Sequence, residues 1–189
     1  NALAAITVAR EVGVDDHAIQ RALREFKGVG RRCEVLGDLK ITAHSANNTH
    51  SIKNIRLIDD YGHHPTELAA TISALKNAYP NRRVVVTFQP HRYTRTRDLF
   101  EDFAQVLSNC DALVLTEVYA AGESAIAGAD GRALASAVRA RGRVNPVFVA
   151  DIQTLPDVLS DILQDQDILL TLGAGNISAI AHQLAEKWA

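Results

Sequence analysis

The stretch "DDYGHHPTEL" at residues 59–68 places two adjacent histidines beside a tyrosine and two aspartates. Histidine exchanges protons near neutral pH, so His63 and His64 are candidates for acid–base chemistry. Adjacent histidines rarely point at one ion and no third ligand accompanies them, which argues against a zinc site. Asp59 and Asp60 have a structural alternative as capping or turn residues. The stretch therefore predicts a polar site that contains an imidazole.

A second group of ionisable side chains lies in "QPHRYTRTRD" at residues 89–98, and its basic members are His91, Arg92, Arg95 and Arg97. Positive residues at a helix start oppose the helix dipole, whereas a bound anion is stabilised there. Arginine can bind a carboxylate or phosphate through two parallel hydrogen bonds, so Arg92 and Arg95 are candidates to hold an anion. The alternative is a solvated basic face, or arginines paired with acids further along the helix: Asp98, Glu101 and Asp102.

A third candidate is the glycine-rich stretch "LGAGNISAI", in which Gly173, Gly175 and Ser178 nearly complete a dinucleotide-binding fingerprint. That fingerprint requires a further strand with an acid about 20 residues on, and the sequence printed here stops at Ala189. The loop could still present backbone N–H groups to a small anion. Equally, its glycines could serve only close packing between strand and helix. The sequence contains neither a P-loop nor a nucleophile elbow.

These candidates follow strands in a repeated strand–helix pattern. Apolar runs occur at 55–59, 84–88, 112–116, 146–149 and 168–172, and helical segments follow near 66–79, 95–107, 131–140, 154–164 and 176–188. Runs such as "VVVTF" and "ILLTL" lack polar alternation, which is typical of strands covered on both faces. We therefore predict an α/β, Rossmann-like fold with a mostly parallel sheet and helices on both faces. Because binding loops gather at the carboxyl ends of such strands, the candidates should share one cleft.

The first part of the chain has a different pattern. Residues 1–12 read as a helix ended by Gly13, and "DDHAIQRALREF" begins a second helix capped by Asp15 or Asp16. The glycines at 28 and 30 then indicate a hinge, which short strand-like runs and a polar loop at 45–54 follow. The sequence begins within a helix and contains no methionine, so we interpret it as the carboxy-terminal part of a longer protein.

Composition excludes several classes of function. Of the 189 residues 47% are apolar, and the net charge of −2 gives no general attraction to nucleic acid or membrane. No apolar run approaches a membrane span, and there is no targeting pattern, so we expect a cytoplasmic protein. The two cysteines form no CxxC pair, which argues against a disulfide framework and a cysteine-built metal site.

Six stretches together resemble the ATP-dependent Mur ligases: "NALAAITVAREVGVDD", "FKGVGRRCEVLG", "DDYGHHPTEL", "QPHRYTRTRDLFEDFA", "EVYAAGE" and "LGAGNI". The resemblance spans nearly the whole chain. It implies that residues 1–29 are the tail of a central ATPase domain. Residues 30–189 would then be a carboxy-terminal Rossmann-like domain that binds an amino acid.

The resemblance also implies a reaction in peptidoglycan precursor synthesis. The carboxylate of UDP-N-acetylmuramate is phosphorylated by ATP, and the amine of L-alanine attacks the resulting acyl phosphate. Magnesium is expected as a cofactor, bound mainly by the central domain, so this chain alone should be inactive. Two alternatives remain open. One is a related ligase that recycles a preformed murein tripeptide, and the other is a non-catalytic module that binds an anion.

Nucleotide-binding roles follow from matching positions in the family motifs. Asn1 resembles the residue that reads the adenine, and Arg32 resembles the hinge arginine that reaches the ribose and phosphates. Asp60 resembles the aspartate that holds the ribose and anchors the hinge.

Amino-acid-binding roles follow in the same way. Tyr61 and His63 would line the pocket around the alanine methyl group and the reacting centre. His91, Arg92 and Arg95 would hold the alanine carboxylate and help to neutralise charge in the transition state. The resemblance thus implies that His63, Arg92 and Arg95 are catalytic, while the role of His64 is left open.

Overall fold

The computed structural model describes residues 2–26, 28–44 and 50–188. The helices are α1 (Ala2–Glu11), α2 (Asp16–Glu25), α3 (Pro65–Ala78), α4 (Tyr93–Asp98), α5 (Phe100–Leu107), α6 (Gly131–Ala140), α7 (Leu155–Ile162) and α8 (Ile177–Lys187). The strands are β1 (Glu34–His44), β2 (His50–Asp60), β3 (Val84–Phe88), β4 (Ala112–Thr116), β5 (Val147–Val149) and β6 (Ile168–Leu172). A 3₁₀ turn, Ile152–Thr154, precedes α7.

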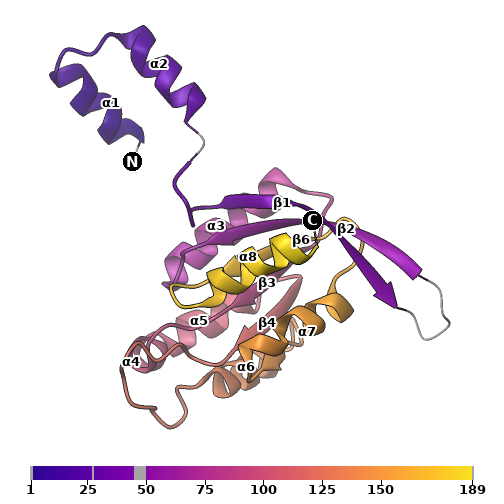
Figure 1. Ribbon diagram of the computed structural model, residues 1–189. Helices are drawn as coiled ribbons and strands as arrows, with labels where there is room; N and C mark the ends of the chain where they lie inside the picture. The colour runs from indigo at the N-terminus through magenta and orange to yellow at the C-terminus, as the bar shows by residue number, and fades with distance from the viewer. Residues whose placement is uncertain (1, 27, 45–49, 189) are drawn as a thin grey trace.

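The strands form one six-stranded sheet in the order β1-β2-β6-β3-β4-β5. β1 pairs antiparallel with β2, and every other neighbouring pair is parallel. Helices cover both faces of the sheet (Figure 1). The predicted mostly parallel, Rossmann-like α/β fold is therefore confirmed.

Two apolar cores lie on opposite faces of the sheet. On one face, α3, α5 and α6 pack with side chains such as Leu68 and Phe103. On the other face, α7 and α8 pack with side chains such as Leu184. Successive strand residues alternate between these cores, because Val86 belongs to the first and Val85 to the second. The absence of polar alternation in "VVVTF" thus has its expected cause, a strand buried on both faces.

The hairpin of β1 and β2 is longer than the sequence suggests. We predicted a polar loop over 45–54, but β2 begins at His50 and Thr42 pairs with Ile52. Residues 45–49 lie outside the described residues. The prediction was wrong over 50–54 because hydrogen bonds with the antiparallel partner maintain extended backbone where the side chains are polar.

The predicted helix at 95–107 begins earlier and is broken. The backbone of Leu99 leaves helical geometry with φ −114° and ψ 22°, which separates α4 from α5. After this break, Phe103 of α5 reaches the sheet, and its ring centroid lies 5.4 Å from that of Phe88. A continuous apolar period does not reveal such a bend, because the packing of Phe103 is a long-range contact.

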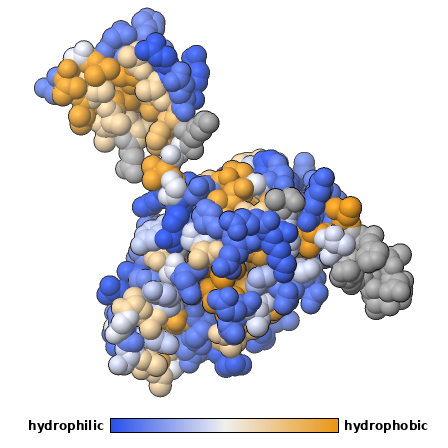
Figure 2. All heavy atoms as spheres, viewed as in Figure 1, coloured by the Kyte–Doolittle hydropathy of each residue, from blue (hydrophilic) through white to orange (hydrophobic). Residues whose placement is uncertain are grey.

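The predicted helices before the hinge are confirmed over the described residues. The side chain of Asp15 caps α2 by accepting a hydrogen bond from the Ala18 N–H at 3.2 Å. Figure 1 shows α1 and α2 extending away from the sheet. In Figure 2 their surface carries an apolar patch, and there Phe26 is 63% exposed. Their assignment to a different domain stays a prediction.

Candidate functional site

The loops that follow β2, β3, β4 and β6 lie at the carboxyl edge of the sheet. From β2 and β3 the chain continues to helices on one face, whereas from β6 it continues to α8 on the other face. Neighbouring loops that leave a parallel sheet in opposite directions open a crevice between them. The fold therefore places the candidate site beside β6.

Four rings from three of these loops form a continuous row. The centroids of Tyr61 and His63 are 5.4 Å apart, and those of His63 and His91 are 6.2 Å apart. His91 in turn stacks on Tyr119, with centroids 5.5 Å apart and planes 14° from parallel. The structure thus brings together the three predicted ring residues, and it adds Tyr119 to them.

His63 and His64 have separate positions although they are adjacent in sequence. The ring of His63 belongs to the row of rings, and its Nδ1 lies 3.1 Å from the Tyr61 carbonyl oxygen. Nδ1 of His64 accepts a hydrogen bond from the Thr66 N–H at 3.3 Å and so caps α3. We therefore assign His64 a structural role.

Glu67 supports this turn from the first turn of α3. Its carboxylate accepts hydrogen bonds from the backbone N–H groups of His63 at 2.9 Å and His64 at 3.2 Å. Burial alone would raise the pKa of Glu67, but these hydrogen bonds and the nearby charges of His63 and Arg32 together lower it. The carboxylate lies 3.7 Å from His63 Nδ1, so a protonated His63 would gain an ion pair.

The surroundings of His91 favour its neutral form. Burial is the largest cause that lowers its pKa, and the nearby charges of Arg95, His63 and Arg92 act in the same direction. Nη1 of Arg95 lies 3.3 Å from His91 Nδ1. Because a guanidinium only donates, Nδ1 accepts and the neutral imidazole carries its proton on Nε2. His91 is thereby suited to donate a hydrogen bond.

Arg92 occupies a strained position at the start of α4. Its φ is +73°, a left-handed value that is uncommon for residues other than glycine, and its N–H donates to the Tyr119 carbonyl at 2.9 Å. The Tyr119 N–H donates in turn to the Pro90 carbonyl at 2.8 Å. These backbone hydrogen bonds join the loops after β3 and β4. The side chain of Arg92 is 51% exposed.

One carboxylate from within the chain, that of Glu123, already lies at this helix start. The carboxylate of Glu123 accepts hydrogen bonds from the N–H and the hydroxyl of Thr94, at 3.0 and 2.7 Å. It also lies 3.8 Å from Nη1 of Arg92. Of the alternative pairings along the helix, Arg97 pairs with its neighbour Asp98 at 2.8 Å. Glu101 pairs instead with Arg141.

The glycine-rich loop is required for close packing. A Cβ at Gly175 would lie 2.7 Å from the Tyr119 ring, and a Cβ at Gly173 would lie 2.9 Å from the Gln89 carbonyl oxygen. The N–H of Ile177, at the start of α8, donates to the Gln89 side chain at 3.1 Å. Because that N–H already has an acceptor, the structure favours the packing interpretation over an anion cradle.

Asp59 and Asp60 are the buried last residues of β2. Asp59 accepts hydrogen bonds from the hydroxyls of Thr171 and Ser178, both at 2.6 Å. Asp60 accepts hydrogen bonds from the N–H groups of Cys33 and Gly62, both at 2.8 Å. The pairing of β2 with β6 continues through both aspartates, so the turn interpretation was wrong for Asp59. It holds for Asp60, whose carboxylate accepts the N–H two residues on, at Gly62.

Of the remaining residues predicted to contact a nucleotide, Arg32 lies at the hinge. Arg32 is exposed, and its N–H donates to the Val29 carbonyl at 3.2 Å. Asn1 lies outside the described residues. The contacts predicted for Arg32, Asn1 and Asp60 with a nucleotide stay predictions.

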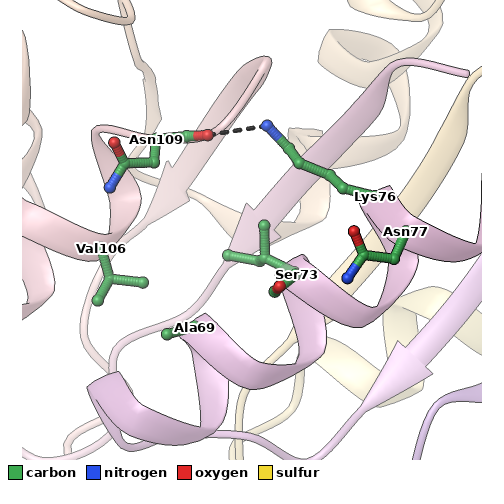
Figure 3. Close-up of a pocket in the computed structure, with 7 residues that line it drawn as sticks. Ala69, Ser73, Lys76, Asn77, Val106 and Asn109 are labelled. Carbon is green, nitrogen blue, oxygen red and sulfur yellow. Dashed lines mark hydrogen bonds between the residues drawn. The ribbon is translucent and has the colours of Figure 1, made fainter. Parts of the chain in front are cut away.

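A separate hollow of about 360 Å³ lies between α3 and α5. Figure 3 shows Ser73, Lys76 and Asn77 on one side of it and Val106 and Asn109 on the other. Lys76 is already engaged, because its Nζ donates to the Asn109 carbonyl at 2.9 Å and to Asp111 at 2.6 Å. The described residues that line this hollow include none of the predicted site residues, so we do not place the function there.

Among residues 2–26, 28–44 and 50–188, no group of three or more histidine, cysteine, aspartate or glutamate side chains could hold a metal ion. The helices of the same ranges include none that is long and apolar enough to cross a membrane.

Three residues at this edge were missed by the sequence analysis: Tyr119, Glu123 and Arg31. Tyr119 and Glu123 belong to the stretch "EVYAAGE", which signalled a loop of unusual composition without indicating their contacts. Arg31 precedes Arg32 in sequence, but its guanidinium lies 4.6 Å above the Tyr61 ring. Such neighbours could not be recognised, because they depend on which loops the sheet brings together.

Comparisons with known proteins agree with this architecture. Residues 46–175 match the family model described as Mur ligase, glutamate ligase domain. A UDP-N-acetylmuramate–L-alanine ligase of Herminiimonas arsenicoxydans is 56% identical over 186 residues, which cover 98% of this chain and 39% of that protein. The ligase of the same name from Burkholderia multivorans is 56% identical over 187 residues, covering 99% of this chain and 38% of that protein.

A solved structure is similar as well. The crystal structure of a UDP-N-acetylmuramate–alanine ligase from Thermotoga maritima superposes with a TM-score of 0.73 at 30% identity, covering 98% of this chain and 36% of that one. The chain thus spans about two fifths of the length of the curated relatives, with 39% covered in the first case. Because the family model matches well over half of its residues, the chain belongs to the Mur ligase family and carries the glutamate ligase domain of that family.

Proposed function

We propose that the whole protein joins L-alanine to the carboxylate of UDP-N-acetylmuramate at the expense of ATP, a step in peptidoglycan precursor synthesis. Residues 30–189 would be the domain that binds the amino acid. Support comes from the family membership and from relatives of that name that are 56% identical over nearly the whole chain. Residues 1–29 would belong to the central ATPase domain.

The row of rings supports an amino-acid pocket at the carboxyl edge of the sheet. Tyr61 and His63 would contact the alanine methyl group, and the guanidinium groups of Arg92 and Arg95 would bind its carboxylate. His91, with its proton on Nε2, would donate a hydrogen bond to the same group. These contacts would hold the amine in one orientation for attack.

The chemical step forms one bond and breaks another. The alanine ammonium first loses a proton, and the free amine forms a C–N bond with the carbonyl carbon of the acyl phosphate. Phosphate then leaves with the electron pair of the C–O bond, and the nitrogen loses its second proton to the departing phosphate as the amide forms. His63 is our candidate for the group near the amine that takes its proton, while Arg92 and Arg95 stabilise the developing negative charge. His63, Arg92 and Arg95 are therefore the proposed catalytic residues.

Nucleotide contacts would come from the hinge and from the segment before it. Arg32 and Asp60 are proposed to reach the ribose and phosphates, and Asn1 the adenine. Asp60 already accepts two backbone hydrogen bonds, which supports its role as the anchor of the hinge. The described residues provide no cluster for magnesium, so we assign no metal ligand to this chain and derive no step through the ion.

The observation that carries this proposal is the convergence of Tyr61, His63, His91 and Arg95 from loops after two different strands. It is tested by incubating the whole protein with ATP and UDP-N-acetylmuramate, together with either L-alanine or the murein tripeptide, and measuring phosphate release and the ligated product. We expect ligation of L-alanine, and a strongly reduced kcat/KM for L-alanine in Arg95→Ala.

Preferential ligation of the tripeptide would replace the proposed acceptor with the one used by the related recycling ligase. If the protein ligates neither acceptor but still binds L-alanine, the result would favour a non-catalytic anion-binding module.

A further inference from the structure

Arg31 is the point at which the hinge segment enters the candidate site. Its Nη2 donates to the Gly173 carbonyl at 2.9 Å, and its guanidinium carbon lies 4.6 Å from the centroid of the Tyr61 ring. One side chain from the hinge therefore touches a ring of the proposed alanine pocket and the loop after β6. A guanidinium over an aromatic face is attractive and restricts where the ring can lie.

The backbone of Arg31 is fixed at the same place. Its N–H donates to the Glu34 carboxylate at 2.7 Å, and its carbonyl accepts from the Tyr61 N–H at 2.8 Å. Its φ of +59° is left-handed, which is a strained conformation for a residue with a side chain. Such a conformation persists only where surrounding contacts hold it. The hydrogen bonds to Glu34 and Tyr61 therefore fix the backbone position of Arg31.

Arg31 also lies beside a buried charge. Its Nε is 3.9 Å from Oδ2 of Asp59, whose side chain is 0% exposed, whereas the side chain of Arg31 is 33% exposed. Within the described residues Nε has no hydrogen-bond acceptor. The guanidinium is therefore held by the carbonyls of Gly173 and, at 3.5 Å, Gly175, by the Tyr61 ring and by the charge of Asp59. All of these attachments depend on the same hinge position.

The two arginines of "GRR" consequently differ. Arg32 is exposed at the hinge, whereas Arg31 turns inward to Tyr61. We propose that Arg31 is a positioning residue that holds Tyr61 and the glycine-rich loop in the geometry that receives the amino acid. This inference rests on the proposed function. If Arg31 has this role, binding of the amino acid requires the hinge segment to contact Tyr61 and the glycine-rich loop. Arg31 itself need not touch the substrate.

The test uses the whole protein with Arg31→Ala and Arg31→Lys, and it measures kcat and the KM of each substrate. Because Tyr61 would lose its support, the KM for L-alanine should rise about tenfold in Arg31→Ala, while the KM for UDP-N-acetylmuramate stays within about twofold. Arg31→Lys keeps a positive charge near Asp59 but loses the planar contact with Tyr61. It should fold and still show a raised KM for L-alanine.

A double-mutant cycle separates positioning from general destabilisation. If Arg31 acts through Tyr61, adding Arg31→Ala to Tyr61→Ala should change the KM for L-alanine by less than about twofold. Arg32→Ala should instead raise the KM for ATP. Arg143→Ala is the control, because its guanidinium donates to the Asn109 side chain near the opposite edge of the sheet.

Two results would overturn the inference: a KM for L-alanine in Arg31→Lys equal to that of the unmodified protein, or fully multiplicative effects in the cycle. Failure of the proposed function can be distinguished from failure of the inference about Arg31. In the first case the unmodified protein would not ligate L-alanine at all.

Discussion

Glu123 and Thr94 connect the loop after β4 to the start of α4 through two hydrogen bonds, of 3.0 Å to the Thr94 N–H and 2.7 Å from its hydroxyl. These bonds lower the pKa of Glu123, with the Thr94 N–H as the largest cause, so the carboxylate stays charged beside Arg92. Arg92 and Arg95, the arginines proposed to bind the amino acid, thus lie at the start of a helix whose first turn is held by hydrogen bonds to Glu123 from a different loop.

Replacement of Glu123 should therefore impair use of the amino acid. In Glu123→Ala the start of α4 loses both hydrogen bonds, and we expect the KM for L-alanine to rise about tenfold. Glu123→Gln keeps an acceptor for Thr94 and should have a smaller effect. Glu101→Ala, which removes an exposed partner of Arg141, is the control. A lowered KM in Glu123→Ala would instead indicate that Glu123 competes with the substrate carboxylate.

The lowered pKa of His91 predicts a specific titration. In protein with ¹³C-labelled histidine, the His91 signal, assigned with His91→Gln, should have its midpoint below 6.5. Arg95→Gln should raise that midpoint by removing a nearby positive charge, yet leave it below 6.5 because burial is the largest cause.

The same shift has a defined sign for stability. Because the unfolded chain binds a proton at His91 more readily, this residue reduces the free energy of unfolding as pH falls below 6.5 and has no such effect well above it. A His91 midpoint at or above 6.5 would contradict both statements.

Gly175 should not tolerate a methyl group. In Gly175→Ala the added Cβ would overlap the side-chain oxygen of Gln89 and lie 2.7 and 2.8 Å from atoms of Tyr119, so Gln89, Tyr119 or the loop must move. We expect a loss of about 1–3 kcal/mol in the free energy of unfolding, as for other overpacked sites, together with weaker use of L-alanine. Gly30→Ala is the matched control, since its Cβ would meet only the Glu34 carboxylate at 3.5 Å. Equal urea midpoints for the two variants would contradict the packing argument.

Ser178 should contribute measurably to stability. Its hydroxyl is one of two that donate to the buried Asp59 carboxylate, so Ser178→Ala leaves an acceptor without its partner. The expected loss in the free energy of unfolding is about 1–3 kcal/mol by urea denaturation. Ser136→Ala removes an exposed hydroxyl bonded to the Arg132 carbonyl and should change stability by less than about 0.5 kcal/mol. Similar losses for both would show that Asp59 does not depend on Ser178.

Much of the fold could be predicted because its signals are local. Runs such as "VVVTF" and "ILLTL" correspond to β3 and β6, and Asp15 caps α2 as expected. The break at Leu99 and the start of β2 at His50 could not be predicted, because the packing of α5 and the pairing with β1 decide them. Propensity and period describe neighbours along the chain, and these features depend on neighbours in space.

For the site, the sequence by itself determined which chemical groups follow the strands: imidazoles after β2 and β3, arginines after β3, and glycines after β6. The rule that parallel strands gather their loops at one edge was sufficient to expect Tyr61, His63 and His91 together. Only the tertiary structure decided that His64 caps a helix, that Glu123 holds the start of α4 and that Arg31 lies over Tyr61. Each of these depends on backbone geometry and on the side from which a neighbouring loop arrives, which residue types and spacing do not specify.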